Sequence, residues 1–334
     1  MVQRFAFTTA AMAAALEETP VTYEELADIE REFDDVETEI IRQQVQLTRP
    51  LYEKRHKTVS QIPNFWPLVI EQAPPDIDEY IQPSDSALLL SSLTSLSVSH
   101  FEIENGGTGD PRSVAIRWEF SENDYFEDRV IEKKFWYRRS KDGWAGLVSE
   151  PVDIKWKKGK DLTGGLLSMV KAVWDEEQAM EKSGTKDKSA HLIEKQRTLR
   201  KKIENTGLGG VSFFAWFGFR GKRVSAEESR LAIEKENGKR QLRQNGVDTT
   251  QAEQDDEEDE DEEEEDDDLE IFPEGDSLAV TITEDLWPGA IKYFTQAQEQ
   301  DALSDDDFES DEDIDEEEPK ARSPEERPTK KRKA

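Results

Sequence analysis

The sequence predicts an α+β fold: a long N-terminal dimerisation helix, a domain in which helices cover a four-stranded antiparallel sheet, and a disordered acidic C-terminal tail. Three observations predict this organisation. Apolar residues recur every three or four positions over residues 22–62, and they alternate with polar residues over 93–156. These are the periods of a helix and of strands with one buried face. Acidic residues crowd the last quarter of the chain, a composition typical of segments that do not fold.

Residues 21–62 predict one long helix. Thr22 followed by Glu25 is a capping-box pattern at its start, and Pro50 is expected to kink it. The apolar stripe has the spacing of a coiled-coil seam, about 3.5 residues. Its members are Leu26, Ile29, Phe33, Val36, Ile40 and Leu47. So long a helix cannot bury the stripe against itself, so we interpret the stripe as a dimerisation surface. Packing on the chain's own domain is the alternative.

Residues 63–300 are expected to form the α/β domain. Its sheet should be an antiparallel meander, with turns at Asn105-Gly106 and Asp142-Gly143 and a last strand over 152–156. Helical spacing follows over 161–182. The other expected parts are a short helix at 84–92, charged insertions at about 175–210 and 222–268, and an apolar segment at 271–294 that packs back on the domain.

The charge of the chain is unevenly placed. The 334 residues carry a net charge of −33, and the part from residue 251 onward holds 35 acids against 8 Lys and Arg, a net −27. A body near neutrality with a polyanionic segment suggests a basic partner, because like charge repels nucleic acid and anionic membranes. No stretch reaches the roughly 18 apolar residues of a membrane span, so no membrane partner is expected.

The sequence offers little for catalysis. It has no Cys, which excludes disulfides, thiolate metal sites and Cys nucleophiles, and it has only 3 His. No Ser/His/Asp spacing, metal-ligand cluster or nucleotide-binding motif is present. We therefore expect a protein that is not an enzyme, without catalytic residues, metal or cofactor.

Residues 1–20 and 301–334 are expected to be disordered. The chain ends in four consecutive cations after Pro328, a pattern that resembles a nuclear localisation signal. They are Lys330, Lys331, Arg332 and Lys333. This cluster predicts a nuclear protein, which could also shuttle to the cytoplasm.

A second interpretation comes from basic residues interleaved with aromatic ones. Nine Lys and Arg residues lie between Lys133 and Lys160, beside Trp136, Tyr137 and Trp144. Such patterns can bind phosphates and stack bases, although the solvated face of amphipathic strands looks the same. The candidates for weak DNA contact are Lys155, Lys157, Lys158 and Lys160.

Five short motifs in order resemble the SET branch of the nucleosome assembly protein family. They are the segments Ile62–Trp66, Asn123–Glu127, Ile154–Thr163, Ser212–Phe217 and Glu284–Pro288. The resemblance implies a histone chaperone acting in nucleosome assembly, disassembly and chromatin remodelling. It also implies a dimer joined by long antiparallel helices, each carrying an α/β "earmuff" domain.

The resemblance further implies partners and contact residues. The expected partners are core histones, either the tetramer-forming central pair or the outer dimer pair, and a second copy of the chain. A histone acetyltransferase or phosphatase is an alternative partner, which the chain would regulate or inhibit. Histone contact is carried onto Glu274, Asp276, Glu284 and Asp285, and onto the start of the acidic run at Asp255, Asp256, Glu257 and Glu258.

Overall fold

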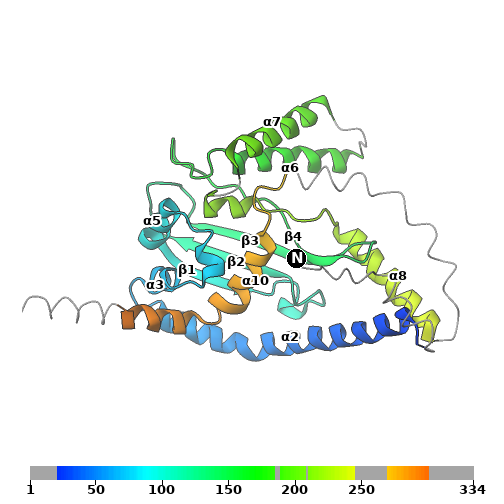
Figure 1. Cartoon of the computed structure of the whole chain (residues 1–334). Coiled ribbons are helices and arrows are strands. Elements are labelled where there is room, and N and C mark those ends of the chain that lie inside the picture. The colour runs from blue at the N-terminus through cyan, green and yellow to red at the C-terminus, as the bar shows by residue number, and fades with distance from the viewer. Residues whose placement is uncertain (1–20, 185–188, 208–209, 245–268, 301–334) are drawn as a thin grey trace, which may run out of the picture.

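The computed structural model describes residues 21–184, 189–207, 210–244 and 269–300. Figure 1 shows a sheet that lies between one long helix, α2, on one side and the helix pair α6 and α7 on the other. The predicted α+β class is therefore confirmed. Within the described ranges, no helix combines the length and the apolar character needed to cross a membrane.

Helix α2 spans Tyr23–Val59 and begins with the predicted capping box, in which the Glu25 N–H donates to Thr22 Oγ1 at 3.2 Å. Its 37 residues extend over about 55 Å. The expected kink at Pro50 is wrong, because the helix runs on through Pro50 and only bows gently (Figure 1). Proline removes one backbone donor, and packing of Tyr52 and Val59 on the domain holds the last turns in place.

Arginines of the domain form ion pairs with the polar side of α2. Arg112 reaches Asp34 at 2.5 Å, and Arg240 reaches Asp35 at 3.0 Å and Glu32 at 3.2 Å. At the other end of α2, Arg55 Nη1 donates to the Trp287 carbonyl at 2.5 Å. The helix is thus fixed against the domain near both of its ends.

The sheet has the order β1-β2-β3-β4, and its neighbouring strands are antiparallel. The strands are β1 (Leu93–Ser99), β2 (Val114–Phe120), β3 (Val130–Arg139) and β4 (Ala145–Ser149). The expected last strand over 152–156 is wrong. The Val152 N–H donates instead to the Phe217 carbonyl at 2.8 Å, so the chain leaves the sheet there to meet the aromatic segment.

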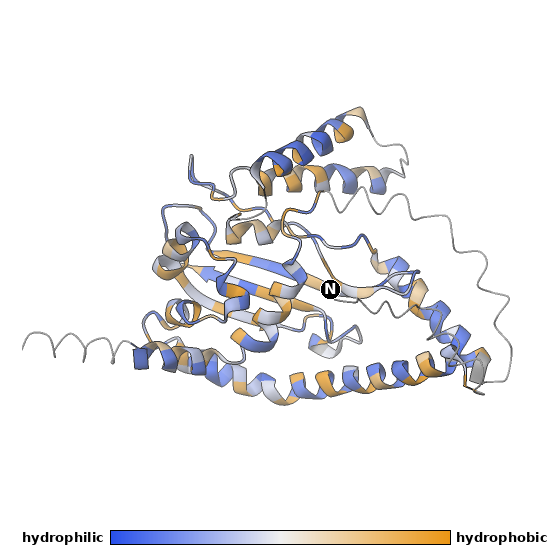
Figure 2. Cartoon of the chain, in the orientation of Figure 1, coloured by the Kyte–Doolittle hydropathy of each residue, from blue (hydrophilic) through white to orange (hydrophobic). Residues whose placement is uncertain are grey.

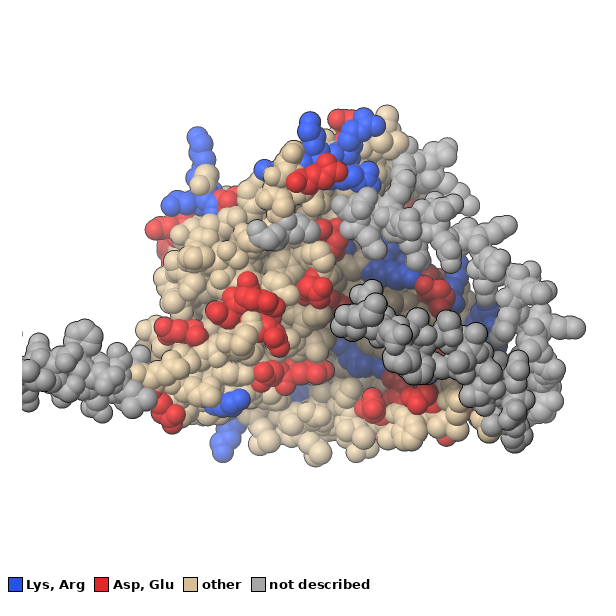
Figure 3. All heavy atoms as spheres, viewed as in Figure 1, with Lys and Arg blue, Asp and Glu red and all other residues tan. Residues whose placement is uncertain are grey.

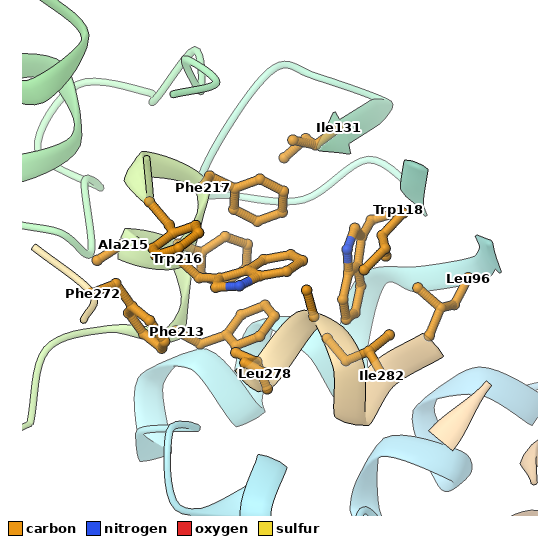
Figure 4. Close-up of a cluster of buried hydrophobic side chains, with 14 of the residues drawn as sticks. Leu96, Trp118, Ile131, Phe213, Ala215, Trp216, Phe217, Phe272, Leu278 and Ile282 are labelled. Carbon is orange, nitrogen blue, oxygen red and sulfur yellow. The ribbon is translucent and has the colours of Figure 1, made fainter. Parts of the chain in front are cut away.

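That aromatic segment, η2 (Phe213–Gly218), forms the centre of the core. All six of its residues are buried, and its rings pack on the sheet. Phe213 lies edge-on to Trp118 at 5.4 Å (Figure 4), and Trp216 stacks on Phe135 at 5.4 Å. The Trp216 Nε1–H donates to the Gly275 carbonyl at 2.8 Å, which joins η2 to α10. The apolar segment after residue 270 therefore packs back on the domain as predicted.

The helices around this core complete the domain. They are α3 (Phe65–Glu71), α4 (Pro75–Asp78), α5 (Pro83–Ser92), α6 (Leu166–Ser183), α7 (Ala190–Thr206), α8 (Ala226–Gln244), α10 (Gly275–Thr281) and the π-helical η3 (Ile282–Leu286), followed by helical residues 290–300. The short 3₁₀ segment η1 (Glu104–Gly106) lies between β1 and β2. Both charged insertions contain packed helices: α7 buries Leu192 and Leu199 on the side of α6, and α8 packs against β3.

Candidate interaction surfaces

The apolar stripe of α2 is open in the single chain. Side chains of this size are rarely left exposed in a contiguous row unless they meet a partner. The exposed fractions are 43% for Leu26, 51% for Ile29, 63% for Phe33, 57% for Val36, 56% for Ile40 and 74% for Leu47. Leu51, 63% exposed, extends the row beyond Pro50. Figure 2 shows apolar residues recurring along the whole of α2.

The opposite side of α2 explains why this stripe stays open. Its acids are held by Arg112, Arg139 and Arg240 of the domain. A helix whose polar side faces its own domain must present the other side outward. This arrangement argues against the alternative, in which the stripe packs on the chain's own domain, because the described residues leave the stripe uncovered.

A second surface gathers acids from two distant parts of the sequence. Helix α10, which carries Asp276 and has Glu274 as its N-cap, packs against α4, which contains Asp76 and Asp78. Glu79 follows α4, and Glu284 and Asp285 follow α10 on η3. We call these seven acids the α4–α10 acidic surface. Figure 3 shows acidic side chains spread over the middle of the viewed face.

Two tyrosines contact acids of this surface, and Tyr80 lies close to three of them. Burial, followed by the negative charges of Glu79, Glu274 and Asp76, raises the pKa of Tyr80. Burial and a hydrogen bond to Asp285 raise the pKa of Tyr293 to about 12; the Tyr293 hydroxyl donates to Asp285 Oδ2 at 2.9 Å. Asp285 is therefore also a structural acceptor, whereas Glu284 is exposed and Asp276 half-exposed.

The seven acids differ from those of α2 in having no ion pair to any residue that the structure describes. Asp34, Asp35 and Glu32 on α2 all face arginines of their own domain. Unpaired exposed carboxylates remain available to cations of another molecule. The α4 acids were missed by sequence reasoning, although three acids within Pro75–Glu79 were a local signal; only the fold brings them beside α10.

Other predicted site residues lie outside the described part of the chain. They are Asp255, Asp256, Glu257 and Glu258, and the terminal Lys330, Lys331, Arg332 and Lys333.

The basic cluster considered for nucleic acid is largely engaged within the domain. Lys133 is fully buried, so its inclusion in a solvent-facing cluster is wrong. Arg138 pairs with Glu102 at 3.2 Å, and Arg112 lies over the Tyr137 ring at 3.7 Å. In the loop after β4, Lys157 Nζ donates to the Asn123 carbonyl, whereas Lys155, Lys158 and Lys160 are exposed. The exposed lysines of the cluster are thus those of this loop and Lys141, which lies in the turn between β3 and β4.

No group of three or more His, Asp or Glu is placed to hold a metal within the described ranges. His100 lies with its Nδ1 2.6 Å from the Pro111 carbonyl, and burial lowers its pKa. Among the described residues, the fold leaves two surfaces open, one apolar and one acidic.

Comparison with known sequences places the chain more narrowly. The sequence profile described as Nucleosome assembly protein (NAP) matches residues 13–297. The chain therefore belongs to the nucleosome assembly protein family.

Among curated relatives, a predicted nucleosome assembly protein of Schizosaccharomyces pombe is 37% identical over 43% of this chain and 61% of its own length. Protein SET of Drosophila melanogaster is 35% identical over 36% of this chain and 43% of its own length. The matches thus span less than two thirds of either relative. Vacuolar protein sorting-associated protein 75 of Saccharomyces cerevisiae is 25% identical over 82% of this chain and 77% of its own length. A crystal structure of Vps75 gives a TM-score of 0.49 at 22% identity, covering 83% of this chain and 98% of that one.

Proposed function

We propose that this protein is a dimeric histone chaperone that binds core histones through the α4–α10 acidic surface and takes part in nucleosome assembly. The observation that carries the proposal is the α4–α10 acidic surface, whose seven acids have no ion pair among the described residues, in a member of the nucleosome assembly protein family. Carboxylates meet Arg and Lys side chains through charge-assisted hydrogen bonds. Each exposed pair contributes only about 0–1 kcal/mol, so several together give a firm but exchangeable contact.

The polyanionic run at 255–268 adds to this picture from the sequence. It ends directly before Leu269, which is buried in the core. A histone held on the folded surface would therefore have 14 consecutive acids attached nearby. We propose that this run screens histone charge without fixed geometry, much as DNA phosphates do. Two copies joined through α2 would double the number of surfaces offered to a histone pair or tetramer.

The proposal is tested by neutralising one surface and measuring histone affinity. In the test variant, Asp76→Asn, Glu79→Gln, Glu274→Gln and Asp276→Asn are combined. We expect the affinity for core histones to fall roughly tenfold or more at moderate salt, from the loss of several weak pairs. Fluorescence titration against labelled central and outer histone pairs would measure this and would also show which pair is preferred.

A matched control removes the same charge elsewhere. Glu122→Gln, Asp124→Asn, Glu127→Gln and Asp153→Asn change four exposed acids around the β2–β3 loop and after β4. The control should leave the affinity within about twofold of the parent protein. Equal weakening by both variants would show that net charge acts rather than this surface, and unchanged affinity in the first variant would rule the surface out.

The cellular location, the DNA contact and the enzyme partner of this protein are also proposals. Nuclear location rests on family membership and on the terminal basic cluster, and fractionation of cells expressing a Lys330–Lys333 alanine variant tests it. DNA contact would be restricted to the loop with Lys155, Lys158 and Lys160, and a gel shift with a three-alanine variant tests that. A partner acetyltransferase or phosphatase would be sought by pull-down without histones.

A further inference from the structure

A groove separates α2 from the outer edge of the sheet. It encloses a cavity of about 310 Å³. Five consecutive residues of and after β1, Leu96 to His100, line it. Successive strand residues point to opposite faces of a sheet, so a cavity that touches all five must lie along the strand's edge. The groove therefore presents the backbone of β1 as well as its side chains.

The backbone at this edge has unused hydrogen-bonding groups. Strand β1 is the outermost strand, with β2 as its neighbour in the sheet. Within the described ranges, the backbone of Leu96–Ser99 makes no hydrogen bond outside its ladder with β2. Alternate residues of an edge strand direct N–H and C=O groups outward, where they can pair with another extended segment. Native proteins normally cover such an edge, so this one should have an occupant.

The floor and ends of the groove favour an apolar anchor. Val45, Tyr52 and Arg55 line it from one face of α2, and Trp66 and Trp287 contribute two large aromatic rings to its lining. That face of α2 differs from the one with the exposed stripe, because Val45 and Tyr52 are offset from Leu47 by more than a quarter turn. The groove therefore stays accessible when the stripe is covered in a dimer.

The charge beside the groove selects an acidic partner. Residues 49–57 of α2 hold four cations, Arg49, Lys54, Arg55 and Lys57, against the single acid Glu53. Of these, Arg49, Arg55 and Glu53 line the groove, together with Glu104. This is a basic stretch in a chain of net charge −33. The net positive charge of this end of α2 favours an acidic extended segment with an aromatic residue over a basic peptide such as a histone segment.

The chain itself carries such a segment directly after the described fold. Residues 301–316 hold ten acids, with Phe308 and Ile314 among them. Their point of departure is fixed, because Gln72 Nε2 donates to Gln300 Oε1 at 2.8 Å and Phe65 stacks on Phe294 at 4.9 Å. Helical residues 290–300 lead away from Trp287 beside the end of α2 (Figure 1).

The length of chain decides which residue can return to the groove. From Trp287 to Gln300 the helix advances about 20 Å. An extended chain covers about 3.3 Å per residue, so about six residues are needed to come back. Leu303 is too close to Gln300, whereas Phe308, eight residues after it, has a reach of about 26 Å.

We propose that residues 301–316 of the same chain bind in the α2–β1 groove as an added edge strand, with Phe308 as the anchor in the cavity. Main-chain hydrogen bonds to β1 supply affinity and the Phe308 pocket supplies register, as in other cases of strand addition. The acids of the segment face the basic end of α2. The contact covers the open sheet edge and holds part of the acidic tail away from the α4–α10 acidic surface.

The absence of Cys from the chain allows a direct test in the full-length protein. Ser99→Cys places a thiol on β1 and Glu309→Cys places one beside the anchor. Under mild oxidation we expect an intrachain disulfide to form at least tenfold faster than in the control pair Ser277→Cys with Glu309→Cys, in which the first thiol lies on exposed α10. Adding Phe308→Ser to the first pair should abolish the difference.

Each other result overturns the proposal. Equal rates in the two pairs, or no effect of Phe308→Ser, would mean that the tail does not use the groove. Disulfides between chains, detected by mixing tagged and untagged copies, would mean that a second copy supplies the segment. If Ser99→Cys lowers the melting temperature, Ser97→Cys on the same edge replaces it. Hydrogen exchange of residues 93–100 should in parallel be at least tenfold faster in Phe308→Ser than in the parent, and no change would count equally against the proposal.

Discussion

Lys133 shows how one residue joins three parts of the chain. Its side chain is fully buried, and Nζ donates to the carbonyls of Glu150 at 3.0 Å, Phe217 at 3.1 Å and Phe219 at 2.9 Å. The charged ammonium form has three N–H donors, one for each of these acceptors, and the neutral amine that prevails above the lowered pKa keeps two of them. The lysine thereby fixes the end of the aromatic segment η2 to β3 and to the end of β4.

We predict that Lys133→Met destabilises the domain by about 1–3 kcal/mol, because buried carbonyls lose their donor. The loss should also depend on pH. Burial lowers the pKa of Lys133 from 10.5 to about 7, so between these values the unfolded chain holds a proton that the folded chain lacks. Stability therefore rises with pH in this window, and the variant lacks that rise. The difference between parent and variant should widen from pH 7 to pH 10.

Urea unfolding followed by circular dichroism measures both effects. Lys158→Met is the matched control, because Lys158 is exposed in the loop after β4. It should leave both the stability and its pH dependence unchanged. A Lys133→Met protein as stable as the parent at every pH would show that the three carbonyls do not need this donor.

At the residue scale the sequence predicted some of this and missed the rest. Alternation placed Lys133 on the same face as Ile131 and Phe135, which is the buried face, whereas its charge suggested solvent. Only the position of η2, some eighty residues later in the sequence, supplies the carbonyls that accept it. The sequence likewise shows that Asp76 and Glu274 are acidic, but it does not show that they lie close together. Their proximity depends on the packing of α4 against α10.

At the scale of elements, periodicity was the dependable signal. The three-and-four spacing predicted α2, and the alternation predicted the strands up to β3. The fourth strand was misplaced because Val152, Ile154 and Trp156 alternate for a different reason. Val152 hydrogen-bonds the Phe217 carbonyl and Trp156 forms an isolated bridge to Phe126, so their side chains pack on η2 rather than on a strand neighbour.

The stripe on α2 leads to an element-scale prediction. Leu26→Asp combined with Phe33→Asp should convert the proposed dimer to a monomer, because each chain would bury two charges in an apolar interface. Sedimentation velocity measures the change. The control is Ala27→Asp with Gln61→Asp, which adds the same charge at exposed positions outside the stripe. Dimers that persist in the first variant at micromolar concentration would place the dimer interface elsewhere.

For the whole molecule, the chain separates two kinds of interaction surface. Acids that fix the architecture, such as Asp34 and Asp35 on α2, are paired with arginines of the domain. The α4–α10 acids have no such partner among the described residues, and the run at 255–268 and the segment after 300 add the bulk of the negative charge. One set of residues, on α2, thus fixes the architecture and supplies the apolar stripe. Another set, the α4–α10 acids and the acidic segments, supplies the proposed binding of cations.

This separation predicts opposite responses of the two associations to salt. Histone binding should weaken steeply as salt rises, because exposed ion pairs are screened over a Debye length that falls from about 10 Å at 0.1 M to about 3 Å at 1 M. Self-association through the α2 stripe should persist, because apolar burial is not screened and sulfate even strengthens it. Analytical ultracentrifugation with and without histones, at low and high salt, measures both in one experiment. A complex that releases histones while the dimer stays intact is the expected result. Dissociation of the dimer at the same salt concentration would mean that charged residues join the two copies. Histone binding that resists high salt would mean that an apolar contact, rather than the acidic surface, holds the histone.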